Sequence, residues 1–299
     1  MYVFDINKEQ EFSSAKHVEK ILGRIADGDV TTAYWEPGQI SPYHCHPDAT
    51  EIYFCFQGGG RMRTPERIVD VASGSFVVHP PGELHEYENG PKRTLLFRVR
   101  YGNDMAARHV DWRGNPGWQQ RPEDAGYFRR HSVVRQRARQ AGKRKITPLS
   151  EALRMQVFDI RKEQAFSRDK HAKREKILGK IADGDFSVVY WEPGQISPYH
   201  CHPEATEIYF WFRGGGRVRT PQTIIDVAPG SFIVHPPGEL HEFENGAKRT
   251  QVFRVRYGKD MLARYFEWRG KEDWEQLPED AAYFERHPVT PQQRSPEMT

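Results

Sequence analysis

Cysteine is scarce in this chain of 299 residues, which contains only three. Cys45, Cys55 and Cys201 are too few, and odd in number, for a disulfide framework, so we expect a cytoplasmic protein in a reducing compartment. The chain also lacks any apolar run near the roughly 20 residues of a membrane span. Its first residues show no basic segment followed by an apolar one, so no secretory signal is expected. We therefore predict no membrane partner.

The chain also lacks an excess of charge of one sign, since it contains 44 Lys and Arg residues and 41 Asp and Glu residues. The small positive excess is concentrated in residues 134–150, which hold six basic residues and no acidic one. A nucleic-acid interface needs basic residues spread over a binding face. A short basic block is typical of a solvated connector or of an arm that contacts an anion. We expect a connector, and no nucleic-acid partner.

An internal repeat organises the rest of the chain. The segment WEPGQISPYHCHP at 35–47 recurs letter for letter at 191–203, and SFVVHPPGELHEYENG at 75–90 recurs with two changes at 231–246. A period this long with two copies indicates a duplicated domain rather than a solenoid. We predict a first domain at 1–133, a basic linker at 134–154, a second domain at 155–292 and a tail at 293–299.

Short β-branched and aromatic runs dominate each copy, and turns containing glycine and proline separate them. In the first copy these runs are TTAYW, TEIYFCF, RIVDVA, SFVVH and TLLFRVRY. This pattern predicts a small all-β sandwich or barrel. Helices are expected only at the edges, around 7–22 and around 122–130, where Pro-Glu-Asp is typical of a first helical turn.

Histidines and a glutamate are spaced as metal ligands in both copies. His44 and His46 are two residues apart, so on a strand both side chains point to one face. Glu51 begins the next strand, and His85 follows a Pro-x-Gly turn. A lone histidine is more often a hydrogen-bonded core residue, but this conjunction of three imidazoles and a carboxylate suits a divalent transition metal. The second copy repeats the predicted ligands as His200, His202, Glu207 and His241.

These residues resemble the two motifs of the cupin superfamily. The first motif, G-x5-H-x-H-x3,4-E-x6-G, is matched by Gly38–Gly58 and Gly194–Gly214, and the second, G-x5-P-x-G-x2-H-x3-N, by Gly74–Asn89 and Gly230–Asn245. The resemblance implies an all-β fold of two tandem double-stranded β-helix, or jelly-roll, barrels with short flanking helices. It also implies one divalent transition metal in each domain. We expect Fe(II), with Mn, Ni, Cu and Zn as alternatives.

Cupins include dioxygenases, decarboxylases, isomerases and non-catalytic binding proteins, and the fold does not choose among them. We expect a metal-dependent dioxygenase that binds a small oxygenated organic acid or phenol beside O₂. The alternatives are a metal-dependent isomerase or lyase of a small carbonyl or sugar-type substrate, and a small-ligand-binding protein. An isomerase or lyase needs a titratable group near the metal. Glu83 and its counterpart Glu239 are catalytic candidates, with Glu86 and Glu242 on the other side of the ligand histidine as alternatives. His79 and His235 are candidate partners of the metal ligands, and a homodimer is a further expectation.

Alternation along the strand after the first ligands predicts which side chains share the ligand face. Counting by twos from Glu51 and Glu207 gives Tyr53, Cys55 and Gln57 in the first copy and Tyr209, Trp211 and Arg213 in the second. We take the two tyrosines as candidate catalytic residues, with packing as the alternative. The other four are candidate substrate-binding residues. Trp211 should shrink the second cavity, and Arg213 could bind a carboxylate, unless it and Gln57 lie at a strand end in solvent.

Two arginines alternate with apolar residues in the last long strand of each copy. Arg98 and Arg100 interrupt the segment 97–101, which otherwise holds Phe, Val and Tyr. Because charge is rarely buried without a partner, we expect the apolar side chains inside and the arginines outside, paired with acids. In the opposite orientation Arg98 and its counterpart Arg254 would be carboxylate anchors, and we count both as candidate substrate-binding residues.

Overall fold

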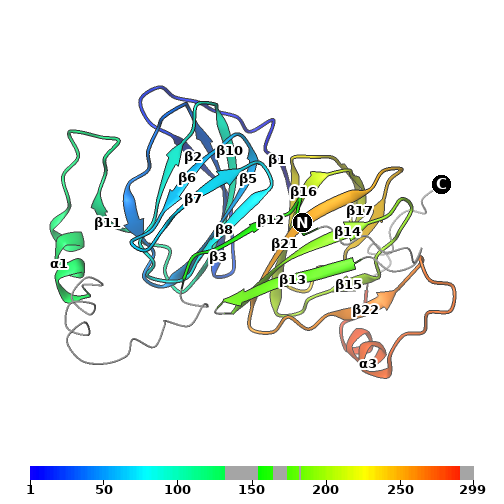
Figure 1. Ribbon diagram of the computed structural model, residues 1–299. Coiled ribbons are helices and arrows are strands. Elements are labelled where there is room, and N and C mark those ends of the chain that lie inside the picture. The colour runs from blue at the N-terminus through cyan, green and yellow to red at the C-terminus, as the bar shows by residue number, and fades with distance from the viewer. Residues whose placement is uncertain (132–153, 164–173, 182, 290–299) are drawn as a thin grey trace, which may run out of the picture. The chain divides into compact units, whose positions relative to one another are not determined.

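The computed structural model describes residues 1–131, 154–163, 174–181 and 183–289 (Figure 1). They form two compact units. The first unit contains residues 10–22 and 27–158, and the second contains residues 1–9, 23–26 and 159–299, in each case as far as they are described. Apart from Arg154, the predicted linker at 134–154 lies outside the described residues, as does the predicted tail.

The first unit is built from one large sheet and two small ones. The large sheet has the order β12 (Gln156–Asp159), β8 (Ser75–His79), β5 (Ala49–Gln57), β10 (Thr94–Gly102), β3 (Gly28–Trp35) and β2 (Val18–Ile25). The small sheets are β7 (Ile68–Ala72), β6 (Gly59–Arg63) and β9 (Glu86–Asn89), and β11 (Arg108–Asp111) with β4 (Tyr43–Cys45). Helix α1 (Pro122–Arg130) contacts β11.

The second unit repeats this plan. Its large sheet has the order β1 (Tyr2–Asp5), β19 (Ser231–His235), β16 (Ala205–Arg213), β21 (Thr250–Gly258), β14 (Gly184–Trp191) and β13 (Arg174–Ile181). Its small sheets are β18 (Ile224–Val227), β17 (Gly216–Arg219) and β20 (Glu242–Asn245), and β15 (Tyr199–Cys201) with β22 (Arg264–Glu267). Helix α3 (Pro278–Arg286) contacts β22.

The prediction of an all-β chain with short flanking helices is confirmed, including the helix at 122–130. The helix predicted around 7–22 is wrong, because β2 begins at Val18 and is the edge strand beside β3. Val18 and Ile25 are β-branched, and pairing with β3 satisfies the backbone of this segment. Among the described residues, no helix is both long and apolar enough to cross a membrane.

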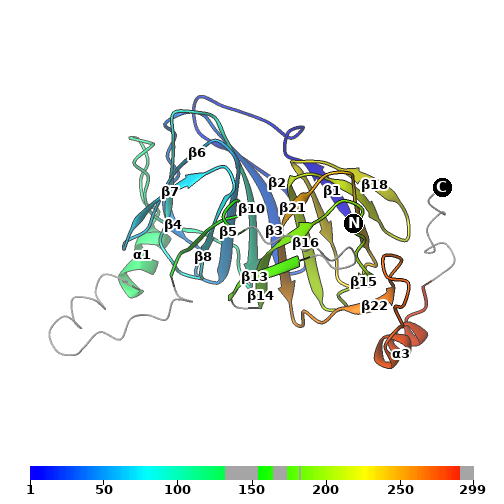
Figure 2. The ribbon, with the colours of Figure 1, turned by 45° about the vertical axis from the view of Figure 1, so that its right-hand side comes forward.

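The leading strand of each repeat belongs to the sheet of the other repeat. Strand β1 pairs antiparallel with β19, placing Phe4 opposite Phe232 with 5.0 Å between ring centroids. Figure 2 shows β1, in blue, among the yellow strands of the second unit. Strand β12 likewise extends the first unit beyond β8, and Phe158 stacks on Phe76 at 4.9 Å. The two repeats have therefore exchanged their first strands.

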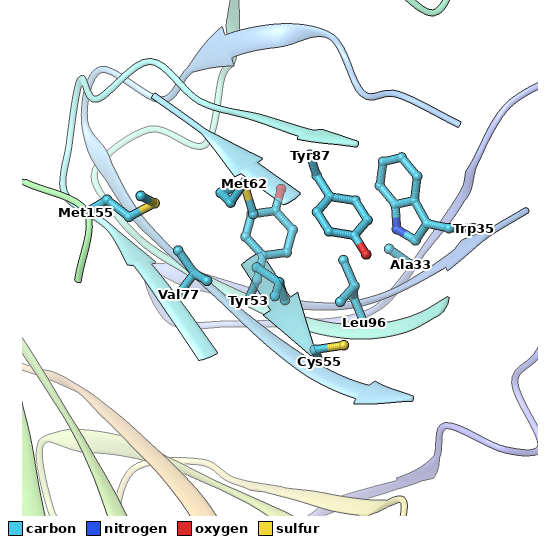
Figure 3. Close-up of a cluster of buried hydrophobic side chains, with 10 residues drawn as sticks. Ala33, Trp35, Tyr53, Cys55, Met62, Val77, Tyr87, Leu96 and Met155 are labelled. Atoms are coloured by element: carbon cyan, nitrogen blue, oxygen red, sulfur yellow. The ribbon is translucent and has the colours of Figure 1, made fainter. Parts of the chain in front are cut away.

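A cluster of buried apolar side chains fills the space between the large sheet and β6, β7 and β9 of the first unit. Figure 3 shows Tyr53 at its centre, with Trp35 and Tyr87 on one side. Met155 reaches the opposite end of the cluster from the exchanged segment, near Val77. Burying such a cluster favours folding by about 25 cal/mol for each Å² of apolar surface removed from water. The exchanged segment is thus part of the core.

Candidate metal centres and the first cavity

The four predicted ligands of the first unit lie on neighbouring segments. His44 is in β4, His46 follows that strand, Glu51 is in β5, and His85 precedes β9. The backbones of His44 and His85 form a β-bridge, with hydrogen bonds of 3.0 and 2.8 Å in the two directions. The turn before His85 contains Gly82, whose φ of 79° favours glycine. Its N–H donates to the His46 carbonyl at 2.7 Å, which fixes the turn against the other ligands.

The ligand atoms of these side chains converge on Glu51. His85 Nε2 lies 2.7 Å from Glu51 Oε2, and His44 Nε2 lies 3.9 Å from the same oxygen. His46 Nε2 lies 3.5 Å from Oε1. A divalent ion with bonds of about 2.1 Å holds adjacent ligand atoms about 3 Å apart. His44, Glu51 and His85 place their ligand atoms within 4.8 Å of one another, a spacing that suits a single ion. His46 lies outside this group, against the other Glu51 oxygen.

Backbone carbonyls orient the three imidazole rings. The Nδ1 atoms of His44, His46 and His85 lie 2.9–3.0 Å from the carbonyl oxygens of Pro42, Met105 and Glu83. Donation of Nδ1–H to a carbonyl leaves the Nε2 lone pair for a metal. Both Glu51 oxygens and the Nε2 atoms of His46 and His85 are buried, and apart from their close approach to one another they have no hydrogen-bond partner among the described residues. Since unpaired buried polar atoms are rare, these residues fit a bound cation.

The protonation states also suit a cation. Burial, with a contribution from His85, lowers the pKa of His44 well below 6.5. Burial alone would raise the pKa of Glu51, but the neighbouring His46 and His85 outweigh it and hold that pKa well below its usual value. A neutral imidazole beside an ionised carboxylate is the form in which these groups bind a metal ion.

The second unit contains the same arrangement. His241, His202 and His200 place Nε2 at 2.8, 3.4 and 3.9 Å from Glu207 Oε2. Their Nδ1 atoms lie 2.9–3.0 Å from the carbonyl oxygens of Glu239, Met261 and Pro198. Burial would raise the pKa of Glu207, yet His202 and His241 hold it well below its usual value. Both repeats therefore fit one divalent ion each.

Arg98 points toward the first centre, so the prediction that these arginines face outward is wrong. Its Nε lies 3.5 Å from Glu51 Oε1, and its Nη1 donates to Glu19 Oε1 at 2.7 Å. The guanidinium is buried because the two carboxylates flank it. The alternating apolar residues of β10 are buried on the other face, so side-chain polarity did not reveal which face is inside.

Arg254 has the same place in the second unit. Its Nη1 lies 3.4 Å from Glu207 Oε1, and it also pairs with Glu175. The part of the prediction that pairs these arginines with acids is therefore confirmed. Each centre includes a buried guanidinium that is shared between a metal-ligating glutamate and a second glutamate.

A cavity of about 590 Å³ opens onto the first centre. Its lining includes His44 and His46 together with Tyr53, Arg98 and Glu19. Two tryptophans and two further imidazoles also line it, namely Trp35, Trp112, His17 and His109. A cavity of this volume is in the range of small-molecule sites.

Sequence reasoning missed Glu19, His17 and His109. His17 stacks on Trp35 with ring centroids 4.0 Å apart and 7° between the planes. His109 lies opposite His44 in the β11–β4 pair, and its ring stacks on that ligand at 5.6 Å. The signal that could have found His109 was a difference within the repeat, since ARHVDWRG at 107–114 becomes ARYFEWRG at 263–270.

This difference changes the contacts of a buried carboxylate. In the first unit His109 Nδ1 lies 3.5 Å from Oδ2 of Asp124, at the start of α1. In the second unit Tyr265 stacks on His200 at 5.8 Å. Oδ2 of Asp280, the counterpart of Asp124, is buried without a hydrogen-bond partner among the described residues. The two centres thus share ligands but differ in the group beside them.

The candidate acids Glu83 and Glu239 bind other histidines. Glu83 Oε2 accepts from His79 Nδ1 at 2.8 Å, and Glu239 Oε2 accepts from His235 Nδ1 at the same distance. Burial raises the pKa of Glu83 to about 7. Burial would also raise the pKa of Glu239, but its partner His235 lowers it. His79 stacks on the ligand His85 at 3.9 Å.

The remaining predicted pocket residues fall into a buried and an exposed group. Tyr53, Cys55, Tyr209 and Trp211 belong to the apolar clusters, and of these Tyr53 also lines the first cavity. Gln57 and Arg213 are exposed at the ends of β5 and β16. This placement agrees with the solvent-facing alternative for those two residues. Cys45, Cys55 and Cys201 are buried free thiols.

Comparison with family models matches a cupin domain twice, at residues 32–97 and 187–253. A cupin 2 conserved barrel domain protein from Leptotrichia buccalis is similar in structure, with a TM-score of 0.58, 10% identity, and coverage of 86% of this chain and 96% of that one. An oxalate decarboxylase–formate complex from Lactobacillus farciminis gives a TM-score of 0.59 at 16% identity, covering 88% of each chain.

A point mutant of the Bacillus subtilis oxalate decarboxylase gives a TM-score of 0.58 at 14% identity, covering 88% of this chain and 79% of that one. A comparison of the sequence with curated proteins finds no match. At these identities, the structural similarities support the fold and not a reaction.

Proposed function

The chain belongs to the cupin superfamily as a bicupin with two metal-binding repeats, and from this premise we propose that it is a metal-dependent dioxygenase of a small organic acid. Its first centre would hold Fe(II) through His44, His46, Glu51 and His85. The observation that carries the proposal is a cavity that contacts two of these ligands and a buried arginine at once. Such a cavity can bring an acid to the ion.

The charge of the first centre favours an anionic substrate. Glu51 and Glu19 carry two negative charges, and Arg98 between them carries one positive charge. With neutral imidazoles and a divalent ion the centre has a net charge of +1, so a monoanion would neutralise it. Burial of the charged groups strengthens this attraction, because the dielectric constant around them is lower than in water. A carboxylate or phenolate therefore fits better than a neutral sugar.

When bound, a redox-active divalent ion supplies electron transfer between an organic acid and O₂. The protein's own residues would do the rest. Arg98 keeps the Glu51 carboxylate fixed, and the tryptophan walls exclude water around an apolar substrate body. Tyr53, whose pKa is raised well above 10 by burial next to Glu51, would stay protonated and act as a hydrogen-bond donor to the substrate. The cavity volume accommodates an acid considerably larger than oxalate.

The test is O₂ consumption by the Fe(II)-reconstituted protein with a panel of aromatic and aliphatic hydroxy acids. Incorporation of both atoms of ¹⁸O₂ into one product is the expected result, and His44→Ala should abolish it at the first centre. Arg98→Met, which keeps length but removes charge, should weaken acid binding. Tight binding of an acid without turnover would replace the proposal with a ligand-binding role.

A metal-dependent lyase is the second candidate. The pair of His109 and Asp124 beside ligand His44 favours it, because a titratable group at that position could move a proton to or from a substrate. The two oxalate decarboxylases of similar structure are also enzymes of this class. Release of CO₂ without net O₂ consumption would support this candidate over the first.

The cellular setting of this enzyme is also a proposal. The three buried free thiols suit a reducing compartment, and we place the protein in the cytoplasm. A homodimer is proposed as its assembly state, which light scattering of the purified chain would test. A mass of one chain would contradict it.

A further inference from the structure

The exchanged segment of the second repeat reaches the metal centre of the first. Met155 immediately precedes β12, and its side chain enters the apolar cluster of the first unit (Figure 3). Its backbone N–H donates to Glu83 Oε1 at 2.7 Å. Glu83 lies in the turn that carries the ligand His85. A residue of one repeat therefore contacts the ligand-bearing turn of the other.

Glu83 in turn holds the environment of His85 in two ways. Its backbone oxygen accepts from His85 Nδ1 at 3.0 Å, which selects the tautomer with Nε2 free for a metal. Its second carboxylate oxygen accepts from His79 Nδ1 at 2.8 Å. The His79 ring lies nearly flat on His85, with centroids 3.9 Å apart and 12° between the planes. The contacts thus form one chain from Met155 through Glu83 and His79 to His85.

The hydrogen bond to Glu83 is the one polar contact of the His79 side chain among the described residues, and its ring also contacts Tyr53. His79 is buried, and its Nε2 has no hydrogen-bond partner among the described residues. A buried imidazole with only one of its two nitrogens hydrogen-bonded costs free energy. If this side chain served only to fill space, an apolar side chain would be more stable there. The bond of His79 to Glu83 and its stacking on the ligand are the interactions that account for an imidazole at this position.

The second unit repeats these contacts with the other exchanged strand. Glu239 accepts from His235, and His235 stacks on the ligand His241 at 3.9 Å with 12° between the planes. The Met1 nitrogen lies against Glu239 Oε1, in the place that Met155 has in the first unit. The same chain of contacts therefore occurs twice, and each time it begins in the leading segment of the opposite repeat.

We propose that each repeat tunes the metal centre of the other through its exchanged segment. Glu83 and His79 are positioning residues, because they act on the metal through His85. Seating of β12 fixes Glu83, and Glu83 fixes the orientation of the ligand ring. By thermodynamic linkage, an ion at the first centre must then favour the seated form of β12 by the same factor. This proposal depends on metal binding at His85 and not on the reaction performed there.

The test measures Co(II) binding to the full chain by its visible absorption. All variants carry His200→Ala, which removes a ligand of the second centre, so that the Co(II) absorption comes from the first centre alone. In this background, Glu83→Ala should weaken Co(II) binding roughly 10- to 100-fold, as is typical when a supporting partner of a ligand is removed. It should also shift the Co(II) absorption bands, which a general loss of stability would not do.

Two further variants separate the contributions of the individual contacts between Met155, Glu83, His79 and His85. Glu83→Gln retains an acceptor for the Met155 N–H and should recover part of the affinity. His79→Phe retains the stacking but loses the hydrogen bond, and should give an intermediate affinity. Glu239→Ala is the matched control, since in the same background it changes the other unit. Its Co(II) affinity should equal that of the background.

The linkage is tested by hydrogen exchange of residues 155–158 in the same background. Added Co(II) should slow exchange there, and Glu83→Ala should remove that effect. Unchanged Co(II) affinity and spectrum in folded Glu83→Ala would overturn the proposal. Loss of dioxygenase activity with intact metal effects would instead concern only the proposed function.

Discussion

Replacing one phenylalanine in each exchanged strand should weaken the unit that belongs to the opposite repeat. Phe4 of the first repeat stacks on Phe232 in the second unit, and Phe158 of the second repeat stacks on Phe76 in the first. Truncating a fully buried phenylalanine to alanine costs about 3–5 kcal/mol. Phe4 and Phe158 are half-buried in edge strands, so about 2 kcal/mol is expected. That energy corresponds to roughly thirtyfold in an opening equilibrium.

Hydrogen exchange read by mass spectrometry locates the effect. Phe4→Ala should speed exchange about thirtyfold in β19 and leave β8 unchanged, whereas Phe158→Ala should do the reverse. Each variant is the control for the other, because the two substitutions are chemically identical. If Phe4→Ala instead deprotected β8, the first strand would pair within its own repeat and the exchange would be refuted.

Three further predictions concern the metal centres. Metal analysis after reconstitution should find two ions per chain, and one in either His44→Ala or His200→Ala; loss of both ions from a single variant would show that the centres are not independent. Burial lowers the pKa of His235 to about 4. Below about pH 6.5 this histidine is therefore protonated in the unfolded chain but stays neutral in the folded one. The metal-free protein should therefore lose about 2 kcal/mol between pH 7 and pH 5 from this group, and urea titration should show a smaller loss for His235→Phe. Exchanging the differing residues, His109→Tyr and Tyr265→His, should reduce kcat at the first centre and alter ligand selectivity at the second; identical kinetics in both variants would contradict a role for His109.

The metal ligands could be predicted from the sequence because their spacing is local. His44 and His46 are separated by one residue, and the Pro-x-Gly turn before His85 has a conformation that glycine specifies. A single histidine could be a metal ligand or a hydrogen-bonded core residue. Repetition of the whole set 156 residues later favours the metal ligand. The all-β fold followed similarly from short runs with period-two alternation.

The surroundings of the centres could not be predicted because they depend on tertiary contacts. Both faces of β10 are buried, so alternation of Arg98 with apolar neighbours could not say which face meets the metal. The partner of Arg98 is Glu19, which lies in β2, where a helix was expected. The pairing of β1 with β19 was equally hidden, since β1 and β12 have nearly the same sequence.

The exchange of leading strands has a consequence for the order of events during synthesis. Strand β1 is synthesised long before its partner β19, which is complete only after residue 235. At about 5–20 residues per second, β1 waits roughly ten to fifty seconds for its partner. The edge of β8 is available from the completion of β8 at residue 79 until β12 is complete at residue 159, which is roughly four to sixteen seconds at the same rate. Strand β1 (YVFD) differs from the proper occupant of that edge, β12 (QVFD), in one residue.

We therefore expect transient occupation of the β8 edge by β1, followed by displacement when β12 emerges. Refolding of the full chain should show a slow phase that accelerates when Tyr2 and Val3 are replaced by residues that disfavour strands. A single fast phase in the unmodified chain would show that the nascent edge is protected by other means. The duplication that gave the protein two metal centres has also given it two nearly interchangeable strands for one edge.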